Sequence, residues 1–546
     1  MTMQAHNLNG FEPEAARTNL RPTQYKEQVH TRFTADQRAH TTVLHAGLTY
    51  AHDVFVVAGM RGLGYRSEML ECPDNAALQI GKEFGNRGQC NPTYFTVGNV
   101  VKHLIHLRDE KGLSTKEIID DYLFVTAGAC GPCRFGTYVT EYRKALRDAG
   151  FDGFRVLLFQ QQGGLKQATG DASGLAINRE FMFTLARAVM AGDVLNLMGY
   201  RLRPYEVEPG AVDAALAKCR AILCEAMENR RSIVMALRRC RPVLDAVKLD
   251  RLQAKPVVSI IGEFWAMTTE GDGNYHLQKF LESEGAEVDV QGVTNWLLYV
   301  IWENRYDRLR RIGLRRDDGG MKGLDGKDAA KTLRALRVAD TAVRVCFGLY
   351  ARATGLRGYH LPDLDRIASL AANHYDNNVR GGEGHMEVGK LVHFVLDRVN
   401  HMTVSVKPFG CMPSSGVSDG VQSLITTKYP QAIFLPIETT GDGQVNVQSR
   451  IQMMLFKARQ RAREEYQDAL QTANLTERDV RRRLALPHFA TNFWRPRHAM
   501  AGAAANIVHA VARPSGLDRW RLWSPARWWR ALTRPAAALR PEFGEE

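Results

Sequence analysis

Apolar positions along this chain occur in two patterns, which together predict an α/β fold. Short continuous apolar runs predict buried strands, and longer stretches of helical period separate them. The predicted strands are 53–59, 122–129, 154–159, 255–263, 286–290 and 432–437, and the sequence from Val404 returns to the same pattern. The predicted helices are 94–108, 134–149, 178–239 with breaks near Pro204 and Pro209, 275–284 and 446–465.

The order of these elements divides the chain into two α/β units. Strand, loop, helix and strand follow one another over 255–290, which is the unit of a parallel sheet. We predict an N-terminal arm over 1–45, a first α/β domain over 46–250 and a second over 251–486. The second domain carries a helical insertion over 296–380, and 487–546 forms a basic tail rich in Trp and Arg. Both basic termini are expected to be flexible.

Composition narrows the classes of protein. The 546 residues exceed what one core holds, and 45% hydrophobic with 24% charged residues is ordinary for a soluble globular protein. The net charge of +13 is compatible with binding to nucleic acid or to an acidic membrane face, and it is also what an arginine-rich genome would give. No nucleic-acid-binding module is recognisable, so no specific nucleic-acid partner is expected. We also see no secretory signal and no transmembrane segment, and expect a cytoplasmic protein.

The most informative motif is Cys130-Gly-Pro-Cys133, which lies between a predicted strand and a predicted helix. Thiols at such a turn lie near the free N–H groups of the helix, which favour thiolate over thiol. Arg134 adds a positive charge beside them. In a reducing compartment, a thiolate pair of this kind is either a metal-cluster site or a redox dithiol.

Three further cysteines lie in turns beside Pro, Gly or Asn: Cys72, Cys90 and Cys411. Loops at strand ends converge on one cleft even when they are distant in sequence. Three or four thiolates there would hold a [4Fe–4S] cluster or a zinc ion. Zinc sites usually show compact Cys-x2-Cys pairs, and only one pair exists here, so the scattered spacing favours iron–sulfur. The remaining cysteines lie in predicted helices and are expected to be core residues: Cys219, Cys224, Cys240 and Cys346.

Three other features bear on ligand binding. Similar Gly-Asp-Gly turns at 268–274 and 438–444 each follow a strand, where α/β proteins bind ligands, although chance similarity also explains them. The segment 384–391 nearly matches a phosphate loop, but Leu391 replaces the magnesium-binding Ser/Thr and no clear strand precedes it. Glu383 and His385 could face a ligand cleft, although a lone histidine in such a segment is more often structural.

The motifs also combine into a family resemblance over roughly 53–463. They are Glu71-Cys-Pro, Gln89-Cys-Asn-Pro, Ala129-Cys-Gly-Pro-Cys-Arg-Phe-Gly-Thr-Tyr, Ile261-Gly-Glu, Gly382-Glu-Gly and Pro408-Phe-Gly-Cys-Met-Pro. The set resembles proteins related to acyl-CoA dehydratase activases, in the C-terminal portion of the large activase-like chains. That portion is similar to the iron–sulfur subunits of 2-hydroxyacyl-CoA dehydratases.

This resemblance implies two Rossmann-like halves with a [4Fe–4S] cluster, single or double, between them. It implies Cys90, Cys130, Cys133 and Cys411 as ligands, with Cys72 next. It further implies low-potential electron transfer driven by an ATP-dependent activase of the actin/Hsp70/sugar-kinase superfamily. An acyl-CoA substrate and a homo- or heterodimer are further expectations. The chain lacks that superfamily's phosphate loops, so the ATPase would be a separate protein.

Two alternatives from other functional classes remain open. The chain could be a non-catalytic scaffold or regulatory subunit that binds the activase. It could also be a thiol–disulfide oxidoreductase that uses Cys130 and Cys133 alone. The sequence leaves open whether the chain is itself catalytic.

Overall fold

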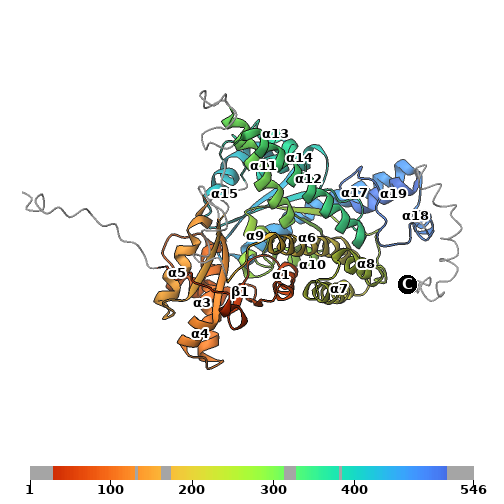
Figure 1. The fold of residues 1–546 in the computed structure, drawn as a ribbon. Coiled ribbons are helices and arrows are strands. Elements are labelled where there is room, and N and C mark those ends of the chain that lie inside the picture. Colours follow the sequence, from red (N-terminus) through yellow and green to blue (C-terminus); the bar gives the residue numbers. More distant parts are fainter. Residues whose placement is uncertain are drawn as a thin grey trace, which may run out of the picture.

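The computed structural model describes residues 29–128, 133–160, 174–312, 328–379, 384–487 and 489–512. Two four-stranded sheets, each entirely parallel, organise these residues into an α/β fold (Figure 1). The predicted fold class is confirmed, and the architecture is consistent with two Rossmann-like halves. The parts of both predicted termini at 1–28 and 513–546 lie outside the described residues.

The first sheet has the strand order β2-β1-β3-β4. Its strands are β1 (Thr42–His45), β2 (Arg66–Met69), β3 (Tyr122–Gly128) and β4 (Arg155–Gln160). The helices between its strands are α1 (Tyr50–Gly62), α2 (Asn75–Phe84), α3 (Asn91–Asp109), α4 (Thr115–Asp121) and α5 (Tyr138–Asp148). The helix predicted after the Cys-Gly-Pro-Cys motif is therefore present; it begins with the 3₁₀ turn Arg134–Thr137.

The second sheet repeats this order as β6-β5-β7-β8. Its strands are β5 (Val257–Gly262), β6 (Glu287–Val290), β7 (Met402–Pro408) and β8 (Ile433–Thr439). Its helices are α9 (Phe264–Thr268), α10 (Leu277–Ser283), α14 (Gly384–Leu396), α15 (Met412–Gly416), α16 (Gln422–Lys428) and α17 (Gln444–Ala473). The segment that nearly matches a phosphate loop lies within α14 and is helical.

One predicted strand is wrong. Residues 53–59 lie within helix α1, and the strand comes earlier, at Thr42–His45, inside the segment predicted to be an arm. Helix α1 packs against α6 (Arg179–Leu202) and α7 (Ala211–Glu228) as well as β2, so several of its sides are buried and its sequence loses the helical period. A short apolar run cannot distinguish a buried strand from such a helix.

A layer of long helices contacts both sheets, with α1 against β2 and α6 against β6. It contains α6 (Arg179–Leu202), α7 (Ala211–Glu228), α8 (Ile233–Asp245) and α12 (Ala329–Thr354) together with α1. Among the described helices, the segment Arg179–Tyr205 alone is long and apolar enough to cross a bilayer, but more than half of its most apolar window is buried inside the protein. Cys219 and Cys240 are core residues as predicted, and Cys224 is half-buried. Cys346 is exposed, so that prediction is wrong; α12 buries Phe347, Tyr350 and Ala351 instead.

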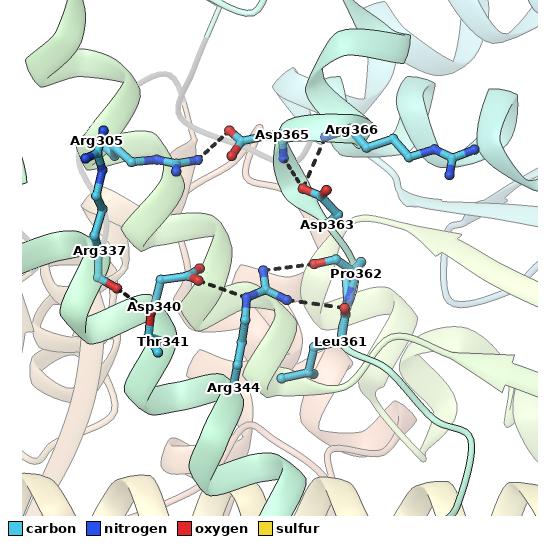
Figure 2. Close-up of polar contacts among 10 residues, drawn as sticks. All are labelled: Arg305, Arg337, Asp340, Thr341, Arg344, Leu361, Pro362, Asp363, Asp365 and Arg366. Carbon is cyan, nitrogen blue, oxygen red and sulfur yellow. Dashed lines mark hydrogen bonds and ion pairs between the residues drawn. The ribbon is translucent and has the colours of Figure 1, made fainter.

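Helices fill the predicted insertion: α11 (Val293–Arg311), α12 and α13 (Leu364–Ala371). Figure 2 shows how arginines join them: Arg305 pairs with Asp365 on α13. Arg344 of α12 binds Asp340 at 2.9 Å and donates to the carbonyls of Leu361 and Pro362. These arginines therefore connect elements of the insertion.

Residues 489–512 of the predicted tail pack onto the second half. Helices α18 (Glu477–Leu484) and α19 (Ala503–Ala512) form a buried cluster with α17 that includes Tyr466, Phe489 and Val508. Trp494 contacts the Phe489 ring at a centroid distance of 4.8 Å. The segment 489–512, which composition assigned to a tail, is thus part of the folded protein.

Candidate functional site

The carboxyl ends of the central strands define the candidate site. In each sheet the strand order reverses between two neighbours, β1 and β3 in the first and β5 and β7 in the second. Open parallel sheets bind ligands in the crevice at such a reversal, outside the carboxyl ends of the strands. The Cys-Gly-Pro-Cys segment follows β3 and Cys411 follows β7, so both cysteine loops leave equivalent strands.

Cys411 is buried at the start of α15, with 7% of its surface exposed. Its N–H donates to the Pro408 carbonyl at 3.1 Å, closing a turn through Gly410, whose φ is +78°. Burial raises the pKa of the Cys411 thiol far above its usual value, and Glu263 raises it further. In the metal-free protein, Cys411 is therefore a protonated thiol.

Cys90 precedes the first residue of α3 and is equally buried, at 6% exposed. Its Sγ lies 3.1 Å from the Tyr138 hydroxyl and 3.2 Å from Thr93 Oγ1. Pro92 lies in the first turn of α3, where its missing N–H costs nothing. These contacts fix the thiol beside the start of α5, the helix that follows the Cys-Gly-Pro-Cys motif.

The backbone segments of Cys90 and Cys411 are adjacent. The Asn91 N–H donates to the Phe409 carbonyl at 3.0 Å, and the Asn91 side chain donates to the Thr439 carbonyl at 2.7 Å. A Cβ on Gly410 would lie 3.1 Å from the Cys90 Cα, so a glycine permits this approach. The first half thus supplies Cys90 and the second half Cys411 at one junction.

The Cys-Gly-Pro-Cys segment is only partly described. Cys130 lies outside the described residues, whereas Cys133 immediately precedes the turn Arg134–Thr137. The Arg134 guanidinium donates to the Gly88 carbonyl, two residues before Cys90. This bond ties the start of the helical segment after Cys133 to the segment that carries Cys90.

Cys72 lies on another loop, after β2, and is exposed. Its Sγ is 4.0 Å from Thr269 Oγ1, and a Cβ on Gly271 would lie 2.6 Å from that Sγ. Its contacts are therefore with the first Gly-Asp-Gly turn. Among the described residues, no group of three His, Cys, Asp or Glu side chains has the spacing of a metal site.

Two carboxyl groups near Cys411 have no role in the sequence analysis: Glu387 is buried and Glu263 is half-buried. Glu263 caps α9 by accepting the Ala266 N–H at 2.8 Å, and burial raises its pKa. Glu387 on α14 accepts a hydrogen bond from the Ser414 hydroxyl at 3.0 Å, and burial raises its pKa to about 7. Glu263 stands in the quoted Ile-Gly-Glu motif, but Glu387 has no signal in the sequence beyond a helical segment.

His385 is not a cleft residue. It is 1% exposed, and its ring stacks on Trp302 at a centroid distance of 4.5 Å and lies 5.3 Å from the Tyr299 ring. Burial lowers the pKa of His385 to about 4, with Lys390 adding to the effect. His385 is therefore a structural core residue that packs against two aromatic rings. Glu383 lies outside the described residues.

The two Gly-Asp-Gly turns meet in space. The Tyr275 hydroxyl, which follows the first turn, accepts the N–H groups of Thr440, Gly441 and Gly443 in the second, at 2.9–3.1 Å. Asp272 of the first turn accepts the Asn75 N–H at 2.8 Å. The aspartate and tyrosine of these turns therefore hold the loops together and tie them to α2.

Neither the family models nor the curated proteins compared with this chain contain a match. The chemistry of the junction is therefore indicated by its own residues alone. Buried thiols beside protonatable carboxyls and a nearby guanidinium suit a thiolate-ligated group better than an exposed nucleophile.

Proposed function

We propose that this protein is an iron–sulfur electron-transfer protein, with its cluster at the junction of the two halves. Cys90, Cys411 and the two thiols of the Cys-Gly-Pro-Cys motif would be the ligands. The observation that carries the proposal is the adjacency of Cys90 and Cys411, which come from different α/β halves yet lie on hydrogen-bonded neighbouring segments. Such convergence of distant cysteines is how scattered ligands hold a cluster.

The surroundings fit a thiolate-ligated cluster. A buried thiol with a raised pKa, such as Cys411, releases its proton when a metal binds, so the metal and the fold stabilise each other. Burial raises the pKa of Glu263, and it raises the pKa of Glu387 to about 7, so Glu387 would add no charge next to an anionic cluster below about pH 7. Arg134 offers a positive charge from the first half. A bound [4Fe–4S] cluster would supply one-electron transfer at low potential.

The partner in this proposal is a separate ATP-dependent activase, and the reaction served is an acyl-CoA dehydration or a comparably difficult reduction. Both follow from the motifs that resemble the activase-related proteins. The described part of this chain contributes the convergent thiols to the proposal, and the ATP chemistry is assigned to the partner.

Electron paramagnetic resonance on protein purified without oxygen and reduced with dithionite tests this function. We expect a signal from a reduced cluster in the native protein and in Cys346→Ala, an exposed cysteine on α12. The signal should be absent from Cys411→Ala. A protein without iron that instead titrates two electrons, with the titration lost in Cys133→Ala, would replace this proposal by the thiol–disulfide alternative.

A further inference from the structure

A second cavity lies away from the cysteines, along β6, the edge strand of the second sheet. Its volume is about 420 Å³, and its walls come from β6, α14 and segments within 356–362 and 492–498. The candidate ligands of the cluster do not line it, and neither do Glu263 and Glu387. Cavities of this size hold small organic molecules.

Positive side chains dominate the charged lining: Arg201, Arg251, Lys390 and Arg495 face the cavity together with only two acidic residues, Glu287 and Asp289. Arg201 donates to the Arg357 carbonyl at 2.8 Å. Burial lowers the pKa of Arg201 well below its usual value, and the charge of Arg495 lowers it further. Both arginines line the same cavity.

The acidic residues are already engaged. Glu287 accepts the Tyr205 hydroxyl at 2.7 Å, and its other oxygen lies 3.9 Å from the Arg495 guanidinium. Asp289 accepts the Ser259 hydroxyl at 3.0 Å. Three arginines, Arg201, Arg251 and Arg495, line the cavity beside these two carboxylates, and the excess of positive charge favours an anionic ligand.

The arginines that line the cavity differ in their roles. Arg251 donates to the carbonyls of Phe489, Thr491 and Trp494, and so holds the C-terminal segment in place. Arg495, by contrast, is 40% exposed, and its partner at 3.9 Å is beyond hydrogen-bond distance. Arg495 is thus placed to reach a ligand without unfolding the wall.

The lining also contains an unused acceptor. Asn295 is 4% exposed, and its Oδ1 has no hydrogen-bond partner among the described residues. A buried amide oxygen without a donor is costly, and a ligand hydroxyl would satisfy it.

We propose that this cavity binds a small hydroxylated organic anion with two negative charges, a phosphate monoester or a dicarboxylate. Arg201 and Arg495 would grip the anion, because guanidinium groups bind such oxygens bidentately. The Asn295 Oδ1 would accept from its hydroxyl group. This site is independent of the iron–sulfur proposal and does not require it.

Titration calorimetry on the full chain tests the site with four probes: glycerol 3-phosphate, malate, inorganic phosphate and uncharged glycerol. We expect one of the two hydroxylated dianions to bind, and to bind more tightly than inorganic phosphate. Arg495→Gln should weaken it at least about tenfold, the loss of one charge-assisted hydrogen bond. Arg334→Gln, an exposed arginine on α12, is the matched control and should bind as the native protein does.

Circular dichroism and thermal melting without ligand check that each variant is folded. Arg201→Gln is the second variant and removes the buried cation; a folded Arg201→Gln should also bind at least about tenfold more weakly. The proposal is overturned if neither hydroxylated dianion binds below about 10 mM. It is also overturned if folded Arg495→Gln binds as tightly as the native protein.

Discussion

The crossing of α2 and α3 provides the sharpest test of the fold around Cys90, since α3 begins directly after that cysteine. The two helices touch through glycines. A Cβ on Gly98 would lie 1.8 Å from the Ala77 carbonyl oxygen and 2.5 Å from the Gly81 nitrogen. All the nearest atoms are backbone, which cannot rotate away as a flexible side chain does.

The size of the effect of Gly98→Ala follows from two opposing contributions. Alanine favours a helix over glycine by about 1 kcal/mol. Ordinary contact requires roughly 3.5 Å between heavy atoms, so the helices must separate by roughly 1.5 Å. Overpacking of this kind costs about 1–3 kcal/mol and occasionally more, and here the clash is with backbone. Because backbone cannot rotate away, we take the cost at about 3 kcal/mol or more, which leaves a net loss of about 2 kcal/mol or more in the free energy of unfolding.

Urea denaturation followed by circular dichroism measures this loss. Gly348→Ala is the matched control, because Gly348 lies inside helix α12 and a Cβ there meets nothing within 4 Å. That control should gain about 0.5–1 kcal/mol, since only helix propensity changes. If Gly98→Ala were as stable as the native protein while Gly348→Ala gained stability, the close crossing of α2 and α3 would be refuted.

Two further predictions concern the turns and the buried histidine. Tyr275→Phe removes the acceptor of three backbone N–H groups and should cost about 2 kcal/mol in urea denaturation, whereas Tyr306→Phe, which loses one exposed bond of 3.4 Å, should change stability little. Because the pKa of His385 falls to about 4 in the fold, the contribution of His385 to the free energy of unfolding should fall by up to about 3 kcal/mol as the pH falls from about 6.5 to 4, in addition to the loss from buried His45. His385→Phe should lack that loss and keep the stacking on Trp302.

Each of these predictions can fail clearly. Equal stability of Tyr275→Phe and Tyr306→Phe would mean that the two Gly-Asp-Gly turns are not held by the tyrosine hydroxyl. For His385, the native protein binds fewer protons than the unfolded chain between pH 4 and 6.5, so its stability must rise with pH there. Parallel pH profiles for the native protein and His385→Phe would contradict the burial of a neutral imidazole.

Sequence patterns predicted the second half better than the first. The apolar run before Glu263 matches β5, which is buried at every position and so has no polar positions to interrupt the run. The run through Ile437 matches β8, an edge strand in which every second position is buried. In the first half, β1 has only four residues, and α1 is packed by helices as well as strand β2. The apolar positions of α1 therefore show no helical period, so the sequence pattern predicts a strand over 53–59 and does not predict β1.

The candidate site was predictable in its loops but not in its surroundings. Cys90 and Cys411 both stand in Pro- and Gly-containing turns, and the parallel sheets bring those turns together. Glu387 was not predictable, because its proximity to Ser414 depends on how α14 packs beside α15. The cavity along β6 could not be predicted from the sequence either, because Arg495 reaches it only when the segment 489–512 packs onto the second half.

Metal and sulfide content tests the central claim most directly. Iron, zinc and acid-labile sulfide should be measured on protein purified without oxygen, for the native chain, Cys90→Ala, Cys411→Ala and Cys346→Ala. We predict about four irons with matching sulfide in the native protein and in Cys346→Ala, and the loss of both in Cys90→Ala and Cys411→Ala. Zinc without sulfide, no metal, or full iron content in Cys90→Ala and Cys411→Ala would contradict a cluster at the junction of the two halves.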